Sequence, residues 1–253
     1  MTDPTSADEE LYARRARSFG AQASAYAEHR PDYPLPAIRW GLPDRARHVL
    51  DLAAGTGKLT DGLLALGLRV TAVEPDPGMR AEFEQRHPGT AAFEGTAERI
   101  PLGEGAVDSV LVGQAFHWFD LDRALTEIAR VTRPGGTVVA LWNHDDLSVP
   151  WVAEFSELTK TGVSRRFLWQ RPDLPEHPGF EPFERRQFSH VQRRTAGTLI
   201  DTVATHSHML TAPDEEREQV ITRLRDFLAR TPETAHGEFD LPITTTVLRA
   251  VRK

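Results

Sequence analysis

Short apolar runs alternate with helical segments along the first 143 residues. Each run is bounded by turn residues, and the segments between the runs carry leucines at helical spacing. Helices are predicted over 58–67, 77–87 and within 121–136, where Pro134-Gly135-Gly136 stops the last one. Such alternation indicates βαβ units, so we expect an α/β fold with a parallel, doubly wound sheet covered by helices on both faces. The predicted strands are 48–53, 69–75, 91–95, 106–114 and 137–143.

The alternation of strands and helices ends after Asn143. Residues 144–182 are rich in proline and predict loop plus helix. The remaining predicted elements are a helix at 8–29, a strand at 183–195, an amphipathic helix at 212–230 and a β-branched final strand at 243–251. We expect a single domain over residues 1–253. Its parts are a helical cap (1–34), a core (35–143), a lid segment (144–235) and the final strand (236–253).

Composition narrows the class of protein. The 253 residues carry a net charge of −7, whereas a nucleic-acid partner usually requires a basic face. The absence of cysteine excludes disulfides, thiolate catalysis and cysteine metal sites, and His206 and His208 lack a partner at metal-site spacing. No apolar run approaches the roughly 18 residues of a membrane span, and the acidic N-terminus lacks the pattern of a secretory signal. We therefore expect a cytoplasmic protein without a nucleic-acid, membrane or metal partner. Its oligomeric state is left open.

A strand, a turn of small residues and a helix follow one another at residues 49–60. Such a turn lets the backbone touch a ligand, and three ligand classes use it. A P-loop requires Ser or Thr after Gly-Lys, but Leu59 follows Lys58. A dinucleotide fingerprint that begins at Ala53 and Gly55 requires a small third residue, but Lys58 stands there. A turn without any ligand is a further alternative.

The third ligand class is S-adenosyl-L-methionine. Glu74 ends the second predicted strand, where an acid accepts hydrogen bonds from ribose hydroxyls. Together the two stretches resemble motif I and the following acidic position of the class I methyltransferases that depend on this cofactor. Asp51 takes the acidic position of motif I, Gly55 and Gly57 match two of its glycines, and Ala53 replaces the first glycine.

The resemblance continues to the fifth strand and implies further cofactor contacts. Met79 corresponds to an apolar residue that lies against the adenine, with core packing as the alternative. Residues 94–102 resemble the stretch that contacts the adenine edge, so Thr96 and Ala97 are expected there. Thr96 stands where the family has Asp, which removes a charged acceptor. Asp108 matches a structural position and is left outside the site.

Two further stretches, 112–120 and 19–34, resemble a subgroup that includes trans-aconitate methyltransferases. The resemblance implies that Gln114 lies close to the cofactor, and that Tyr26 and Arg30 contact it from the N-terminal helix. A guanidinium fork suits the carboxylate of the methionine moiety, with a surface salt bridge as the alternative for Arg30.

His117 and Trp118 are candidate acceptor-site residues. His117 acts either as a base or, as we favour, in positioning or structure. Asn143, His144, Asp145 and Asp146 follow the fifth strand and are weaker candidates.

The family resemblance also implies a seven-stranded sheet with an antiparallel last strand and a lid over the acceptor pocket. The expected function is methyl transfer from S-adenosyl-L-methionine to a small-molecule acceptor, for which a carboxylate is one candidate. No catalytic residue is assigned. Two alternatives remain: a non-catalytic adenosylmethionine-binding protein that acts as a partner or sensor, and a nicotinamide oxidoreductase.

Overall fold

The computed structural model describes residues 31–162 and 174–253. Within this part the chain forms two compact units. The larger unit comprises Pro31–His144, 174–190 and Thr244–Lys253, and the smaller unit comprises 145–162 and Val191–Ile243. The helix predicted over 8–29 lies outside the described residues, and the single-domain organisation stays a prediction.

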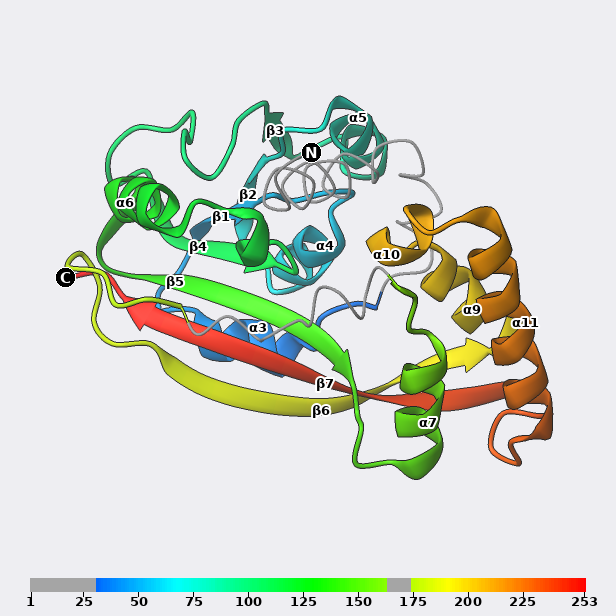
Figure 1. Cartoon of the computed structure of the whole chain (residues 1–253). Coiled ribbons are helices and arrows are strands. Elements are labelled where there is room, and N and C mark those ends of the chain that lie inside the picture. Colours follow the sequence, from blue (N-terminus) through cyan, green and yellow to red (C-terminus); the bar gives the residue numbers. More distant parts are fainter. Residues whose placement is uncertain (1–30, 163–173) are drawn as a thin grey trace, which may run out of the picture. The chain divides into compact units, whose positions relative to one another are not determined.

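Figure 1 labels the elements as they are named below. The strands are β1 (His48–Leu52), β2 (Arg69–Val73), β3 (Ala91–Phe93), β4 (Val107–Gly113), β5 (Thr132–Asp145), β6 (Glu184–Thr195) and β7 (Glu238–Val251). The helices are α3 (Leu35–Gly41), α4 (Lys58–Ala65), α5 (Pro77–Arg86), the 3₁₀ turn η2 (Phe116–Trp118), α6 (Leu121–Val131), α7 (Pro150–Leu158), α9 (Ala196–Ala204), α10 (Ser207–Leu210) and α11 (Asp214–Arg230). All seven strands predicted from the sequence are present.

The strands form one sheet in the order β3-β2-β1-β4-β5-β7-β6. The pairs β1–β2, β1–β4, β2–β3 and β4–β5 are parallel. The backbone N–H of Arg252, just past β7, donates to the carbonyl of Gly136 near the start of β5, so β7 runs opposite to β5 (Figure 1). This confirms the expected seven-stranded, mostly parallel sheet with a reversed last strand.

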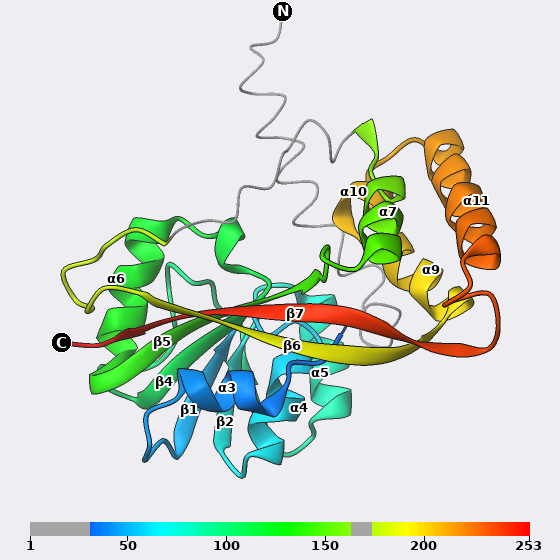
Figure 2. The same ribbon diagram turned by 90° about the horizontal axis from the view of Figure 1, so that it is seen from below.

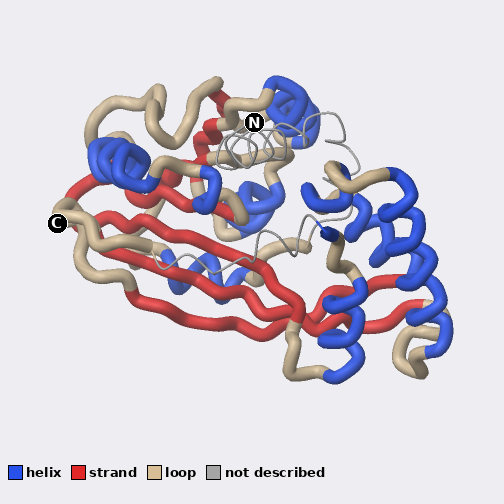
Figure 3. The backbone as a smooth tube through the Cα atoms, viewed as in Figure 1, coloured by secondary structure: helices blue, strands red, loops and turns tan. Residues whose placement is uncertain are grey.

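Alternate strand residues bury on opposite faces of the sheet. In β1, Leu50 and Leu52 pack with Ile128 of α6, whereas Val49 packs with Ile38 of α3. Side chains alternate across a strand, so each face of this sheet carries its own core. Figures 2 and 3 show α3 and α4 on one side and α6 on the other. The doubly wound arrangement is therefore confirmed.

Helix α6 is shorter than predicted, and β5 begins earlier. The sequence predicted that Pro134-Gly135-Gly136 stops this helix, but α6 already ends at Val131 and Thr132 is extended. Arg133 precedes Pro134, whose ring disfavours a helical conformation in the preceding residue. The Thr132 hydroxyl donates to the Ile128 carbonyl and closes the last turn. The pairing of β5 with β4 then skips from Thr132 to Thr137 across an irregularity that accommodates the Pro-Gly-Gly segment.

The smaller unit is held by an apolar cluster of its own. Buried side chains of α7, α9, α10 and α11 pack with Phe239, Leu241 and Ile243 of β7. Thr195 caps α9 in a capping box with Thr198, a signal that the sequence analysis missed. No helix in residues 31–162 or 174–253 is long and apolar enough to cross a membrane.

Candidate functional site

Loops from neighbouring strands converge at the carboxyl edge of the parallel strands. The register places Leu52 opposite Val73, and Val73 opposite Phe93. Asp51 lies opposite Leu111, so β4 ends beside β1. The residues that follow each strand therefore meet at one edge, where open α/β sheets bind their ligands. The segments brought together are 53–57, 74–79, 94–97 and 114–118.

The turn after β1 has an unusual backbone. Ala53 has φ 56°, Gly55 has φ 57° and Gly57 has φ 90°, all in the left-handed region that favours glycine. A Cβ added to Gly55 would meet no described heavy atom within 4 Å, whereas one on Gly57 would lie 2.4 Å from Nε2 of His87. Gly55 thus faces open space, and Gly57 is required for close packing.

Glu74 bridges the tip of β2 and the glycine turn. Its Oε2 accepts from the backbone N–H of Gly55 at 2.8 Å, and its Oε1 accepts from that of Asp76 at 2.9 Å. The residue is only 7% exposed, and this burial raises the pKa of the carboxyl against the lowering effect of the two N–H donors. A carboxylate oxygen has two lone pairs, so each oxygen of Glu74 can accept one more hydrogen bond.

Asp51 lies beneath the same turn and is 1% exposed. Its Oδ2 accepts from the hydroxyl of Thr60 at 2.6 Å, and its Oδ1 has no hydrogen-bond partner among the described residues. Burial raises the pKa of Asp51 to about 7, and the nearby charge of Glu74 acts in the same direction. A buried carboxyl group therefore lies beneath the turn, and one of its oxygens is still able to accept a hydrogen bond.

The segment after β3 carries two predicted contacts, Thr96 and Ala97. Thr96 is exposed, while the Ala97 side chain packs in the core with Ile100. Met79, at the start of α5, is buried. The Asp76 side chain caps this helix by accepting from Met79 N at 2.9 Å. The roles of Thr96, Ala97 and Met79 toward adenine stay predictions.

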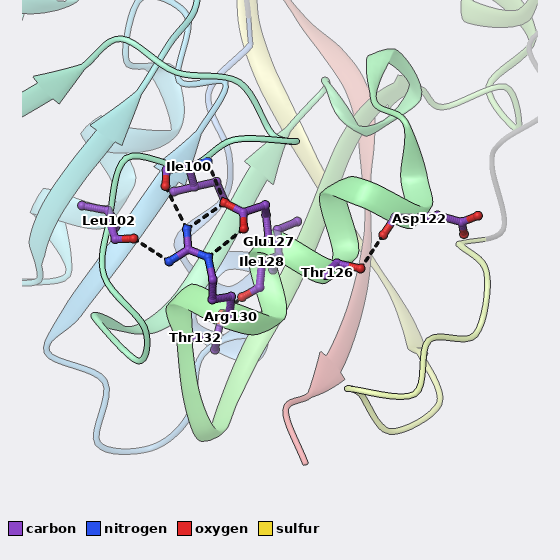
Figure 4. A network of polar contacts seen from close by, with 8 residues as sticks. All are labelled: Ile100, Leu102, Asp122, Thr126, Glu127, Ile128, Arg130 and Thr132. Carbon is purple, nitrogen blue, oxygen red and sulfur yellow. Dashed lines mark hydrogen bonds and ion pairs between the residues drawn. The ribbon is translucent and has the colours of Figure 1, made fainter.

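A charged clamp holds the end of this segment against α6 (Figure 4). Arg130 donates to both carboxylate oxygens of Glu127 at 2.7 Å. The same guanidinium donates to the carbonyls of Leu102 at 2.7 Å and Ile100 at 2.9 Å, and Glu127 accepts from Ile100 N. The Arg130 hydrogen bonds lower the pKa of Glu127. The loop that carries Thr96 is thereby fixed at its far end.

Gln114 follows β4 and has a left-handed backbone with φ 57°. Its side chain donates to the backbone carbonyl of Asn143 at 3.0 Å. Asn143 in turn accepts from the hydroxyl of Thr245 at 2.6 Å and donates to the carbonyls of Pro31 and Asp32. Asn143, only a weak candidate from sequence, therefore joins the ends of β4 and β5 to the start of the described chain.

His117 and Trp118 lie on η2, directly after Gln114. The turn is anchored by buried Phe116, whose ring packs against Phe119 and Trp142 at centroid distances of 5.3 and 6.5 Å. His117 and Trp118 are half-buried, with ring centroids 4.7 Å apart. Their place at the carboxyl edge follows from the strand, whereas their action on an acceptor stays a prediction.

Two contacts near the glycine turn were not predicted. His87, at the end of α5, packs against Gly57, and desolvation lowers the pKa of its imidazole. Lys58 pairs with Asp32 at 2.9 Å and ties the first residue of α4 to the segment that follows Arg30. No local spacing signals these pairs. Tyr26 and Arg30 lie outside the described residues.

Asp108 has the structural role expected of it. Its Oδ2 accepts from the backbone N–H groups of Arg47 and His48, and its Oδ1 pairs with Arg133 at 2.6 Å. These contacts lie at the amino edge of the strands, opposite the converging loops.

Comparisons with known proteins agree with this geometry. Residues 50–140, which run from within β1 into β5 and include the converging loops, match the model of a methyltransferase domain. An uncharacterized methyltransferase from Mycobacterium tuberculosis is 44% identical over 92% of this chain and 95% of its own length. The solved structure of a protein assigned as a type II methyltransferase from Anaeromyxobacter dehalogenans is 27% identical. Its TM-score is 0.61, covering 88% of this chain and 97% of that one.

A more distant structure shares the fold. It is phosphoethanolamine N-methyltransferase 2 from Haemonchus contortus, solved with phosphomonomethylethanolamine and S-adenosylhomocysteine. It is 18% identical with a TM-score of 0.51, covering 86% of this chain and 52% of that one. With the match over residues 50–140 and the relative that aligns along nearly its whole length, the chain belongs to the methyltransferase family.

Proposed function

We propose that this methyltransferase binds S-adenosyl-L-methionine at the carboxyl edge of β1, β2 and β4 and transfers its methyl group to a small-molecule acceptor. The observation that carries this proposal is the position of the Glu74 carboxylate. It is buried, hydrogen-bonded to the turn after β1, and retains lone pairs for ribose hydroxyls.

The residues present fit such a cofactor. Gly55 faces open space above the turn, and Asp51 has a buried oxygen without a partner in the described part of the chain. When bound, the cofactor would supply a methyl group that its sulfonium already activates. Glu74 would bind the ribose hydroxyls, while the small residues of the turn admit the backbone to close contact. Gln114, held by Asn143, would line the neighbouring loop.

For the acceptor we propose a small molecule with a carboxylate as the reacting group. This finer assignment rests on the resemblance of residues 112–120 to the trans-aconitate subgroup. A carboxylate is deprotonated at neutral pH and would need no general base. The task of His117 and Trp118 would then be to align the acceptor and exclude water.

The test is Glu74→Gln, with binding measured by calorimetry. The amide keeps one acceptor oxygen but turns an NH₂ toward one of the two backbone donors. Charged hydrogen bonds of this kind contribute roughly 1.5–3 kcal/mol each, so we expect affinity for S-adenosylhomocysteine to fall at least tenfold. Glu104→Gln, which changes an exposed acid, is the matched control and should bind as the wild type does.

A second ligand separates ribose binding from support of the turn. A 2′,3′-dideoxy analogue of S-adenosylhomocysteine should lose less affinity than the parent ligand when Glu74 is changed. Equal losses would assign Glu74 to holding Gly55 alone and would refute the ribose role. Release of S-adenosylhomocysteine from the methyl donor in the presence of dicarboxylic acids tests transfer itself. Tight binding without turnover on any acceptor would favour the non-catalytic alternative.

A further inference from the structure

A second cluster of charged side chains lies at the amino edge of the same strands. Arg47 immediately precedes β1, and Arg69, the first residue of β2, lies opposite His48 in the register. Strand β1 of five residues spans about 17 Å, so this cluster is well separated from the glycine turn at the other end. It surrounds a pocket of about 500 Å³ lined by Arg45, Arg47, His48, Arg69, Asp108 and Arg133.

The one carboxylate in this lining, that of Asp108, already has hydrogen-bond and ion-pair partners. Asp108 accepts from the backbone N–H groups of Arg47 and His48, both at 2.8 Å. Its other oxygen pairs with Arg133 at 2.6 Å, and Arg133 also donates to the Gly105 carbonyl. These interactions hold the pKa of Asp108 below its usual value although burial opposes them. Asp108 therefore organises the pocket and neutralises one guanidinium.

The remaining guanidiniums are not neutralised. Arg45 and Arg47 are exposed, and their guanidinium groups make no hydrogen bond or ion pair with any residue that the structure describes. Arg69 directs its Nη2 to Nδ1 of His48 at 2.8 Å. Four arginines against one carboxylate leave an excess of about three positive charges in the lining of a protein whose net charge is −7.

His48 lies between these arginines and the sheet. Nδ1 of His48 lies 2.8 Å from Nη2 of Arg69, which can only donate, and 3.1 Å from the Ala106 carbonyl, which can only accept. Nε2 of the same ring lies 2.9 Å from the Thr71 hydroxyl. Desolvation and the adjacent Arg69 charge lower the pKa of the imidazole. The imidazole thus lines a positive pocket, so an anion that enters the pocket should raise its pKa.

We propose that this pocket is a binding site for a small phosphate-class oxyanion, separate from the methyl-transfer site. Arginine forks match the paired oxygens of a phosphate group, and two such forks without partners border the same space. The pocket can hold a ligand larger than a single phosphate, so pyrophosphate is the more suitable probe. The net charge of −7 on the chain opposes a long polyanion, which favours a small ligand over a nucleic acid.

The test uses the full chain and inorganic pyrophosphate at fixed ionic strength. Calorimetry should show saturable binding with a dissociation constant below about 1 mM. The double variant Arg45→Gln/Arg47→Gln removes two guanidiniums without breaking any contact within the described residues, and it should weaken binding at least tenfold. Arg223→Gln, an exposed arginine of α11, is the matched control and should bind as the wild type does. Binding of S-adenosylhomocysteine should be unchanged in both variants.

The pKa of His48, measured by NMR, is a second readout, and a change of surface charge elsewhere should not alter it. Pyrophosphate should raise the pKa of His48 in the wild type and in Arg223→Gln, but far less in the double variant. Vesicles of phosphatidylglycerol and a single-stranded oligonucleotide test other sources of the same chemistry. Binding to either of them without binding of pyrophosphate would overturn the proposal. So would equal affinity in the double variant and the wild type, or an unchanged His48.

Discussion

Asp51→Asn tests the electrostatic balance beneath the glycine turn. The substitution replaces a buried carboxyl by an amide of the same shape, and the Thr60 hydroxyl can still donate to the remaining oxygen. Burial raises the pKa of Asp51 from 3.8 to about 7, although the hydrogen bond from Thr60 opposes this shift. The charge of Glu74 raises the pKa further. The folded protein therefore holds a proton at pH values where the unfolded chain has lost it.

The sign of the effect follows from this difference. Stability that is present below pH 4 is lost as the pH rises toward the folded-state pKa near 7. The slope is about 1.4 kcal/mol per pH unit while only the folded state is protonated. Between pH 5 and 7 this one group should lower the free energy of unfolding by about 2 kcal/mol, and the loss should level off above pH 7.

The assay is urea unfolding at pH 5, 6, 7 and 8, for the wild type and Asp51→Asn. Burial also raises the pKa values of Glu74 and Asp145, but these groups titrate in both proteins. The variant should thus keep their part of the pH dependence and lose the part of Asp51. An unpartnered amide N–H adds a constant cost, which shifts the whole curve without changing its slope. Asp226→Asn, an exposed site on α11, is the control and should follow the wild type. Parallel curves for Asp51→Asn and the wild type would refute the reasoning.

Three further outcomes follow from the site. Arg130→Met should lower the free energy of unfolding by about 1–3 kcal/mol, because it removes the donor of the Leu102 carbonyl and takes donors away from Glu127 and the Ile100 carbonyl. A loss under about 0.5 kcal/mol in urea unfolding would contradict the clamp. His117→Ala should raise the KM for the acceptor while kcat stays within about tenfold of the wild type. A kcat lowered by about 10²-fold or more, together with loss of the histidine-like limb of the pH profile, would instead show that His117 is a general base. Asn143→Ala should destabilise the fold by about 1–3 kcal/mol, because it removes the acceptor of the Thr245 hydroxyl and the donor to the Pro31 and Asp32 carbonyls. A loss under about 0.5 kcal/mol in thermal unfolding would show that these contacts contribute nothing.

The sequence predicted those parts of the site that depend on neighbouring residues. The strand, turn and helix around Gly55, and the position of Glu74 at the tip of β2, follow from periodicity and turn chemistry. Pro134 was recognised as part of the stop of α6, but the helix ends three residues earlier, at Val131, because a proline also restricts the residue that precedes it, here Arg133. Helix termini are the least reliable part of such a prediction.

Contacts between distant segments could not be predicted in this way. His87 packs against Gly57, and Asn143 reaches Pro31 and Thr245, across separations for which a single sequence gives no periodic signal. The pairing of Lys58 with Asp32 is of the same kind. The fold brings these residues together only after the strands are ordered in the sheet. Polar contacts that join loops therefore have to be found in the structure.

The left-handed backbones of Ala53 and Gln114 bear on how this enzyme could be engineered. A residue with a side chain pays about 1–2 kcal/mol for this conformation, and the adjoining hydrogen bonds, Ala54 N to Val73 O and Gln114 N to Leu141 O, maintain it. Glycine at either position would relieve that cost but would broaden the conformational ensemble of the rim. Directed evolution that selects for thermostability alone would therefore favour such a glycine. The resulting enzyme would have a more stable fold but a less well-ordered edge where its ligands bind.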